Sequence, residues 1–191
     1  MKIKSILTLI ILAFFLQGYE YKYEVPKLDA TNNAASRNSK GIMYMEMGYY
    51  NAAMTEFKVA ISLNPNSPAS AAYYNNLGLL YIKINKLIEA SECFDKAISL
   101  NPVFLEYYKN KVDVLDKSGV IDKFLSRYIK QINQDNKNSN AYLMAGLICA
   151  QMGQKANAIN YLQQYVAIEK TNVMSRAVKQ EIKDLKRLRR K

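Results

Sequence analysis

The feature that most constrains this chain of 191 residues is a six-residue string that occurs twice. Ala60–Pro65 and Ala97–Pro102 both read Ala-Ile-Ser-Leu-Asn-Pro. The identity continues upstream at equal spacing, in the pairs Phe57 and Phe94, Ala53 and Ala90, Tyr44 and Tyr81, and Gly41 and Gly78. An internal period of this length indicates a stack of similar units, each unable to bury its apolar face alone. With the first glycine at position 8 of a 34-residue unit, the sequence predicts units over residues 34–67, 71–104, 105–138 and 139–172.

The glycines indicate what each unit is. Beyond residue 18, each glycine occupies position 8 (Gly41, Gly78, Gly146) or position 15 (Gly48, Gly119, Gly153). Glycine inside a helix costs about 1 kcal/mol relative to alanine, so its repeated use at position 8 predicts close approach of a second helix. At position 15 it suits the left-handed residue that ends a helix. We therefore predict two antiparallel helices per unit, with stacked units sharing one core.

These positions resemble the tetratricopeptide repeat family, whose pattern is a small residue at 8, aromatics at 11 and 24, alanines at 20 and 27, and proline at 32. The first unit matches with Gly41, Tyr44, Ala53, Phe57, Ala60 and Pro65, and the second with Gly78, Tyr81, Ala90, Phe94, Ala97 and Pro102. The resemblance covers about residues 34–172. It implies an all-α, right-handed superhelix of about four helix pairs, and residues 173–191 are predicted to form a basic amphipathic capping helix.

The third unit departs from the pattern. It has Val112, Phe124 and Gln131 at positions 8, 20 and 27, where the family has small residues. Larger side chains at these positions predict looser or shifted packing of its two helices. The fourth unit matches in part, through Gly146 and Ala158.

The N-terminus resembles a secretory signal peptide. Two lysines precede an apolar run, Ile6–Leu16, that is followed by Gly18. As a helix this run is too short to cross the roughly 30 Å apolar core of a bilayer. We predict a signal peptide over residues 1–18, with an uncleaved short anchor as the alternative, and a polar spacer over residues 19–33. The protein is then exported, periplasmic or associated with the cell envelope, and its two cysteines are expected to be separate buried thiols rather than a disulfide.

The net charge of +11 is concentrated at the C-terminus, where residues 173–191 hold eight basic and two acidic side chains. A basic tail on a nearly neutral body argues against nucleic-acid binding. Basic side chains in the last turns of a helix interact favourably with the helix dipole, which is one role for this cluster. Alternatively, the cluster tethers the chain weakly to an anionic membrane surface. Its members are Lys183, Lys186, Arg187, Arg189, Arg190 and Lys191.

Catalysis finds no support in the sequence. The chain has no histidine, which excludes Ser-His-Asp and Cys-His sites and imidazole metal ligands. Phosphate-binding glycine loops and CxxC motifs are missing, and Asp113, Asp116 and Asp122 lack the alternation and glycine of a calcium loop. We predict a non-catalytic scaffold or adaptor without cofactor or metal.

The family resemblance implies a concave groove lined by the first helix of each unit. Its predicted lining residues are Asn38, Ile42, Met45, Asn75, Asn76, Leu79, Ile82, Lys109, Asp113, Asp116, Leu143 and Leu147. In this hypothesis the apolar members contact a peptide or amphipathic helix of a partner, Asn75 or Asn76 binds its backbone, and the two aspartates accept a Lys or Arg. Alternatively, the same residues are core because the N-terminal spacer or the C-terminal helix folds into the groove.

The family's carboxylate clamp for acidic chaperone C-termini is not reproduced. Of its five positions only Asn76 matches, and Glu106 has the wrong charge. Exported bacterial proteins that resemble this family serve in envelope assembly, pilus or secretion machinery, and that resemblance implies a periplasmic scaffold or adaptor for a protein or peptide partner.

Overall fold

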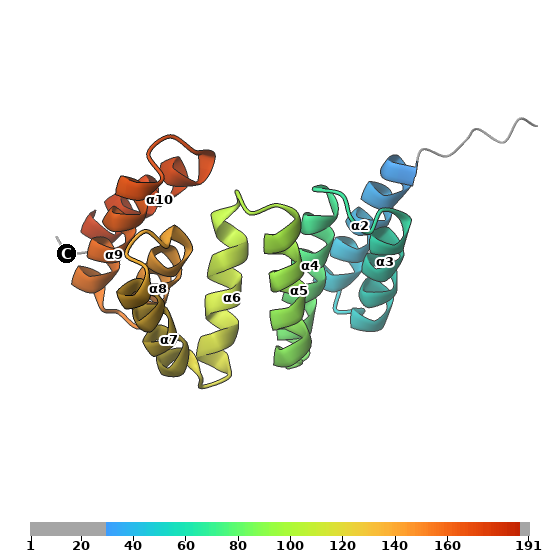
Figure 1. The fold of residues 1–191 in the computed structure, drawn as a ribbon. Coiled ribbons are helices and arrows are strands. Elements are labelled where there is room, and N and C mark those ends of the chain that lie inside the picture. The colour runs from blue at the N-terminus through green and yellow to red at the C-terminus, as the bar shows by residue number, and fades with distance from the viewer. Residues whose placement is uncertain (1–29, 188–191) are drawn as a thin grey trace, which may run out of the picture.

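The computed structural model describes residues 30–187, so the predicted signal peptide and most of the predicted spacer lie outside the described residues. The described part is all-α, and its helices stand side by side in a curved row (Figure 1). In chain order they are α2 (Ala30–Glu46), α3 (Tyr50–Leu63), α4 (Ser70–Lys83), α5 (Leu87–Leu100), α6 (Leu105–Lys117), α7 (Ile121–Gln134), α8 (Ser139–Gln151), α9 (Lys155–Ile168) and α10 (Val173–Arg187). The predicted helix-pair superhelix is confirmed.

Close packing at position 8 joins the two helices of the first, second and fourth units. A Cβ atom added to Gly41 would lie 2.6 Å from the ring of Phe57, and one added to Gly78 would lie 2.7 Å from the ring of Phe94. Both rings are completely buried. Only glycine lets the second helix approach this closely, as the sequence pattern predicted.

The turns between paired helices use the left-handed backbone region. The φ angles are 81° at Gly48, 68° at Gly119 and 74° at Gly153. In the second unit Asn85 takes the same role with a φ of 58°, and asparagine is one of the few other residues that tolerate this conformation. The prediction for position 15 is confirmed.

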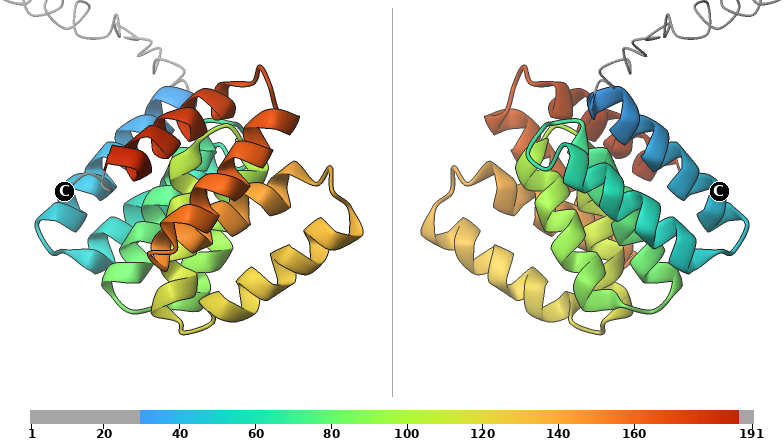
Figure 2. Two further views of the ribbon diagram at one scale, coloured as in Figure 1. Left: turned by 90° about the vertical axis from the view of Figure 1, so that its left-hand side faces the viewer. Right: turned by 90° about the vertical axis from the view of Figure 1, so that its right-hand side faces the viewer.

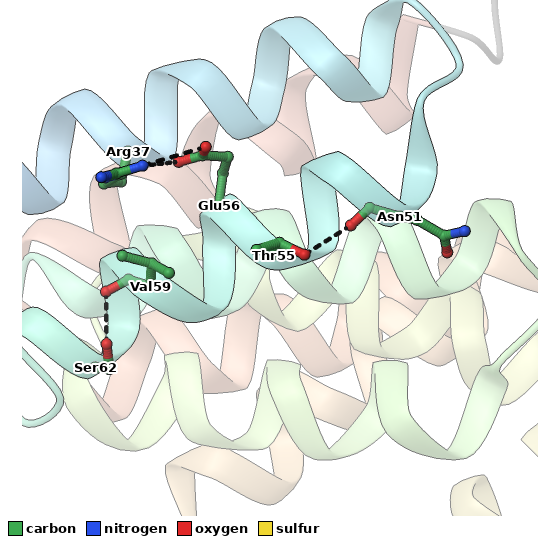
Figure 3. Close-up of polar contacts among 6 residues, drawn as sticks. All are labelled: Arg37, Asn51, Thr55, Glu56, Val59 and Ser62. Atoms are coloured by element: carbon green, nitrogen blue, oxygen red, sulfur yellow. Dashed lines mark hydrogen bonds and ion pairs between the residues drawn. The ribbon is translucent and has the colours of Figure 1, made fainter.

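The first helix pair is also held by polar contacts (Figure 3). Arg37 Nη1 lies 3.1 Å from Glu56 Oε2, which links α2 to α3. Within α3 the Thr55 hydroxyl donates to the Asn51 carbonyl at 3.0 Å, and the Ser62 hydroxyl donates to the Val59 carbonyl at 2.9 Å. These two hydroxyls bond to carbonyls of their own helix, so of these three contacts only the ion pair joins α2 to α3, in addition to the apolar packing around Gly41.

The third unit breaks the regular packing. Its helices α6 and α7 touch far less than the paired helices of the other units do, whereas α7 packs normally on α8. Figure 2 shows α7, in gold, standing away from the stack. Val112 at position 8 is buried in the core that α6 shares with α8, α9 and α10. The shifted packing predicted from the larger side chains of this unit is confirmed.

The two largest apolar cores of the described residues both include side chains of α6. One core is built from α3, α4 and α5 and includes Val114 of α6. The other joins Tyr108, Val112 and Leu115 of α6 to α8, α9 and α10. The displacement of α7 therefore leaves α6 as the packed link between the N-terminal and C-terminal halves.

Cys93 and Cys149 are both free and buried, as predicted, and they belong to different cores. Burial raises the pKa of the Cys93 thiol from its ordinary value of 9.0 to about 12. A thiol of this kind stays protonated and acts as a small apolar side chain. Among residues 30–187, no helix is both long and apolar enough to span a bilayer.

Candidate functional site: the concave face

Asparagine pairs connect the first helices of neighbouring units. Asn76 Nδ2 on α4 donates to Asn38 Oδ1 on α2 at 2.9 Å, and Asn110 Nδ2 on α6 donates to Asn75 Oδ1 on α4 at 2.8 Å. In both pairs the acceptor occupies position 5 of one unit and the donor occupies position 6 of the next. This asparagine ladder fixes the register of α2, α4 and α6 beside one another.

The predicted apolar members of the first two units lie together beside this ladder. Ile42 and Met45 of α2 and Leu79 and Ile82 of α4 are all half-buried, with their inner atoms packed on the N-terminal core. Their outer atoms remain accessible. We call these four residues the apolar stripe.

The fourth unit does not extend this face. Leu143 and Leu147 of α8 are 2% and 4% exposed, in the same core as Ile182 and Leu185 of α10. The expectation that these two leucines line an open groove is therefore wrong. The alternative weighed from the sequence, in which the C-terminal helix folds over these residues, applies at this end because α10 turns back toward α6.

The charged members of the predicted groove are already engaged. Lys109 Nζ on α6 lies 3.3 Å from Glu181 Oε2 on α10. Asp113 pairs with Lys117 on its own helix. Asp116 Oδ2 accepts a hydrogen bond of 2.8 Å from the side-chain amide of Gln151. The two aspartates thus have separate partners within the chain rather than forming one open acceptor for a cation.

A small cavity of about 190 Å³ remains where α10 closes over α6 and α8. Lys109, Gln151 and Glu181 line its polar side, and Leu147 and Leu185 line its apolar side. Its volume is well below that of a usual small-molecule pocket. The apolar stripe and the asparagine ladder are the remaining features of this face among the described residues.

Comparison with protein families decides the class of the chain. Models described as "Tetratricopeptide repeat" match residues 34–67, 71–104 and 139–172, which together span just over half of the sequence. The chain belongs to the tetratricopeptide repeat family. Folds of this family generally serve as scaffolds for protein–protein interaction rather than as catalysts. The displaced third unit, residues 105–138, lies outside the matched ranges.

Solved structures of other tetratricopeptide repeat proteins are similar to this one. A crystal structure of MamA is 28% identical, with a TM-score of 0.47, 76% of this chain and 83% of that chain covered. The crystal structure of YrrB, described as a TPR protein with an unusual peptide-binding site, is 20% identical, with a TM-score of 0.43 and 77% and 74% covered. PilF of Pseudomonas aeruginosa is 18% identical, with a TM-score of 0.49 and 84% and 71% covered. The comparison with curated proteins gives no match.

The basic cluster of this tetratricopeptide repeat protein lies partly on α10. Lys183, Lys186 and Arg187 are exposed there, and Arg187 lies 3.7 Å from Asp184. Arg189, Arg190 and Lys191 lie outside the described residues. The apolar side of α10 is buried in the C-terminal core, so in this structure it is engaged with the protein itself, as in a capping helix of a repeat stack.

Two residues that join helices of the stack, Asn110 and Glu181, were not among the predicted site residues. Asn110 occupies position 6 of its unit, the same position as Asn76, so the repeat register carried the signal for the second asparagine pair. Glu181 had no such signal, because its contact with Lys109 depends on the direction in which α10 leaves the stack. Among the described residues there is no group of three or more Cys, Asp or Glu side chains placed to hold a metal ion.

Proposed function

We propose that this tetratricopeptide repeat protein is a non-catalytic adaptor of the bacterial cell envelope that holds a peptide or helix of a partner protein on its concave face. The observation that carries the proposal is the apolar stripe. Full burial of one such side chain stabilises by about 1.5–3 kcal/mol relative to exposure, so covering the accessible part of four of them gives a partner a substantial gain.

The proposed site is restricted to α2, α4 and the start of α6. The C-terminal end is closed by α10, which buries Leu143 and Leu147. The bond between Asn76 and Asn38 uses one donor and one acceptor of the two amides. A side-chain amide can make up to four hydrogen bonds, so this pair retains donors and acceptors for the backbone of a bound segment. Asn75 of α4, in contrast, is buried and accepts a hydrogen bond from Asn110 of α6.

The proposal is tested by Leu79→Ser combined with Ile82→Ser. The matched control is Met47→Ser combined with Val173→Ser, two apolar residues that are 59% and 60% exposed outside the stripe. A photo-crosslinking residue at position 42 is used to capture partners in intact cells. We expect one defined adduct that disappears in the stripe variant and persists in the control, with both variants equally helical by circular dichroism.

A stripe variant that keeps its helicity and still captures every partner would refute binding at this face. Export is tested separately, by fractionating cells and sequencing the N-terminus of the mature protein. We expect a chain that begins at Tyr19 in the envelope or periplasmic fraction. A cytoplasmic chain that retains residues 1–18 would overturn the envelope role and leave the binding face unaffected.

A further inference from the structure

The displacement of α7 opens a cleft between α5 and α7, away from the concave face. One end of the cleft is apolar, with a volume of about 310 Å³. Leu87 and Ile88 of α5, Val114 of α6, and Val120 and Phe124 of α7 contribute to its lining. Ile88 is 76% exposed, so this end is accessible from solvent.

The other end of the cleft is polar, with a volume of about 430 Å³. Ser91 and Phe124 line both cavities, so the two lie next to each other along the cleft. The polar lining includes Arg127 and Tyr128 of α7 and Asn140 of α8, all of which carry hydrogen-bond donors. This end can therefore receive a group that accepts several hydrogen bonds.

The apolar side of α7 is incompletely covered. Phe124, Leu125, Tyr128, Ile129 and Ile132 recur at helical spacing, and each of them is only half-buried. In the first, second and fourth units the corresponding helix is packed tightly on its partner, whereas α7 has lost most of its contact with α6. A bound segment in the cleft would cover part of this apolar side.

The charges in the polar end favour an anion. Asp95 on α5 is paired with Lys111 on α6, so these two residues nearly cancel. Arg127 is exposed and takes part in none of the ion pairs formed among the described residues. Asp95, Arg127 and Tyr128 all line this polar end. Burial and the nearby Asp95 raise the pKa of Tyr128, and Arg127 opposes this. Glu92 is the acidic residue at the apolar end.

We propose that this cleft is a second binding site, which takes an acidic peptide segment of a partner protein. Apolar side chains of the segment occupy the end formed by Leu87, Ile88 and Phe124, and a carboxylate binds Arg127. The site is separate from the apolar stripe, so one chain can hold two partner segments at once. Arg127 supplies charge complementarity, because its guanidinium can bind a carboxylate through two parallel hydrogen bonds.

The test uses the full chain and a fluorescein-labelled synthetic peptide of repeated Glu-Leu-Leu-Glu units, with binding followed by fluorescence anisotropy. Lys-Leu-Leu-Lys and Glu-Ser-Ser-Glu peptides of equal length are the probes for charge and apolar content. We expect the acidic apolar peptide to bind best, and Arg127→Glu and Ile88→Ser each to weaken it by about tenfold or more. Lys123→Glu makes the same charge change on α7 outside the cleft lining, and Val173→Ser removes another exposed apolar side chain that also lies outside it, so neither should change binding more than about threefold.

The stripe variant with Leu79→Ser and Ile82→Ser should bind this peptide like the unchanged protein, which separates the cleft from the proposed concave site. Failure of the acidic apolar peptide to bind would overturn the proposal. Equal binding of the basic peptide would overturn it as well. So would binding that is insensitive to both Arg127→Glu and Ile88→Ser.

Discussion

Replacing Gly146 by alanine tests the packing that organises the repeat. A Cβ atom there would lie 2.7 Å from Cγ and Cδ2 of Leu162 and 3.2 Å from the backbone nitrogen of Leu162. Leu162 is completely buried, so its side chain cannot turn aside freely, and the backbone nitrogen can move only with helix α9. Overpacking of a core costs about 1–3 kcal/mol, and alanine regains about 1 kcal/mol of helix propensity. We therefore expect Gly146→Ala to lower the free energy of unfolding by about 1 kcal/mol.

The measurement is urea unfolding followed by circular dichroism. The control site is Asn160, which is exposed in the middle of α9, where the difference between Asn160→Ala and Asn160→Gly gives the helix propensity alone. Leu162→Ala by itself should cost about 2–5 kcal/mol because it leaves a cavity. Combining it with Gly146→Ala should cost less than the sum of the two, since the new methyl group enters that cavity. The packing argument fails if Gly146→Ala stabilises the protein as much as alanine does over glycine at position 160.

Cys93 should react with iodoacetamide far more slowly in the folded protein than in urea, since burial raises its pKa to about 12; equal rates would contradict its burial. Because the folded state holds this proton when the unfolded chain has lost it, the contribution of Cys93 to stability should fall as pH rises above about 9, and the loss measured by urea titration should be smaller in Cys93→Ala. Gly153→Ala should destabilise by about 1 kcal/mol through its φ of 74° alone, and Gly153→Asn should restore part of the loss in thermal unfolding. Asn110→Ala should cost about 1–3 kcal/mol by leaving the buried amide oxygen of Asn75 without its donor, and a loss no larger than that of an exposed Asn→Ala substitution would disprove the importance of this bond.

Much of the fold could be predicted because the repeat is encoded in short-range spacing. Glycine at position 8 and an apolar residue at position 24 lie against one another in the first, second and fourth units. The disturbed packing of the third unit was also predictable, because Val112 has a side chain where the pattern has none. The position that α7 adopts was not predictable, because it depends on how α8 packs against α6.

The concave face was predictable only in part, for the same reason. The apolar stripe and the asparagine positions follow from the register of the first two units. The burial of Leu143 and Leu147 depends on α10, which begins beyond the last unit and packs over residues far from it in sequence. A helical pattern identifies which side of α10 is apolar, but the angle at which that helix crosses the stack is set by tertiary packing.

Because α6 contributes side chains to the two largest cores, it is the helix that connects the N-terminal and C-terminal halves of the protein. Stability in a repeat stack is close to a sum over nearest neighbours, so the weakest interface divides the chain into blocks that unfold separately. Here the weakest contact between paired helices is that of α6 with α7 in the third unit, so we expect the division there. A small rotation of α6 would therefore reorient one half of the protein relative to the other, and substitution of its buried Val112 or Val114 would alter the superhelical pitch at a distance from the apolar stripe.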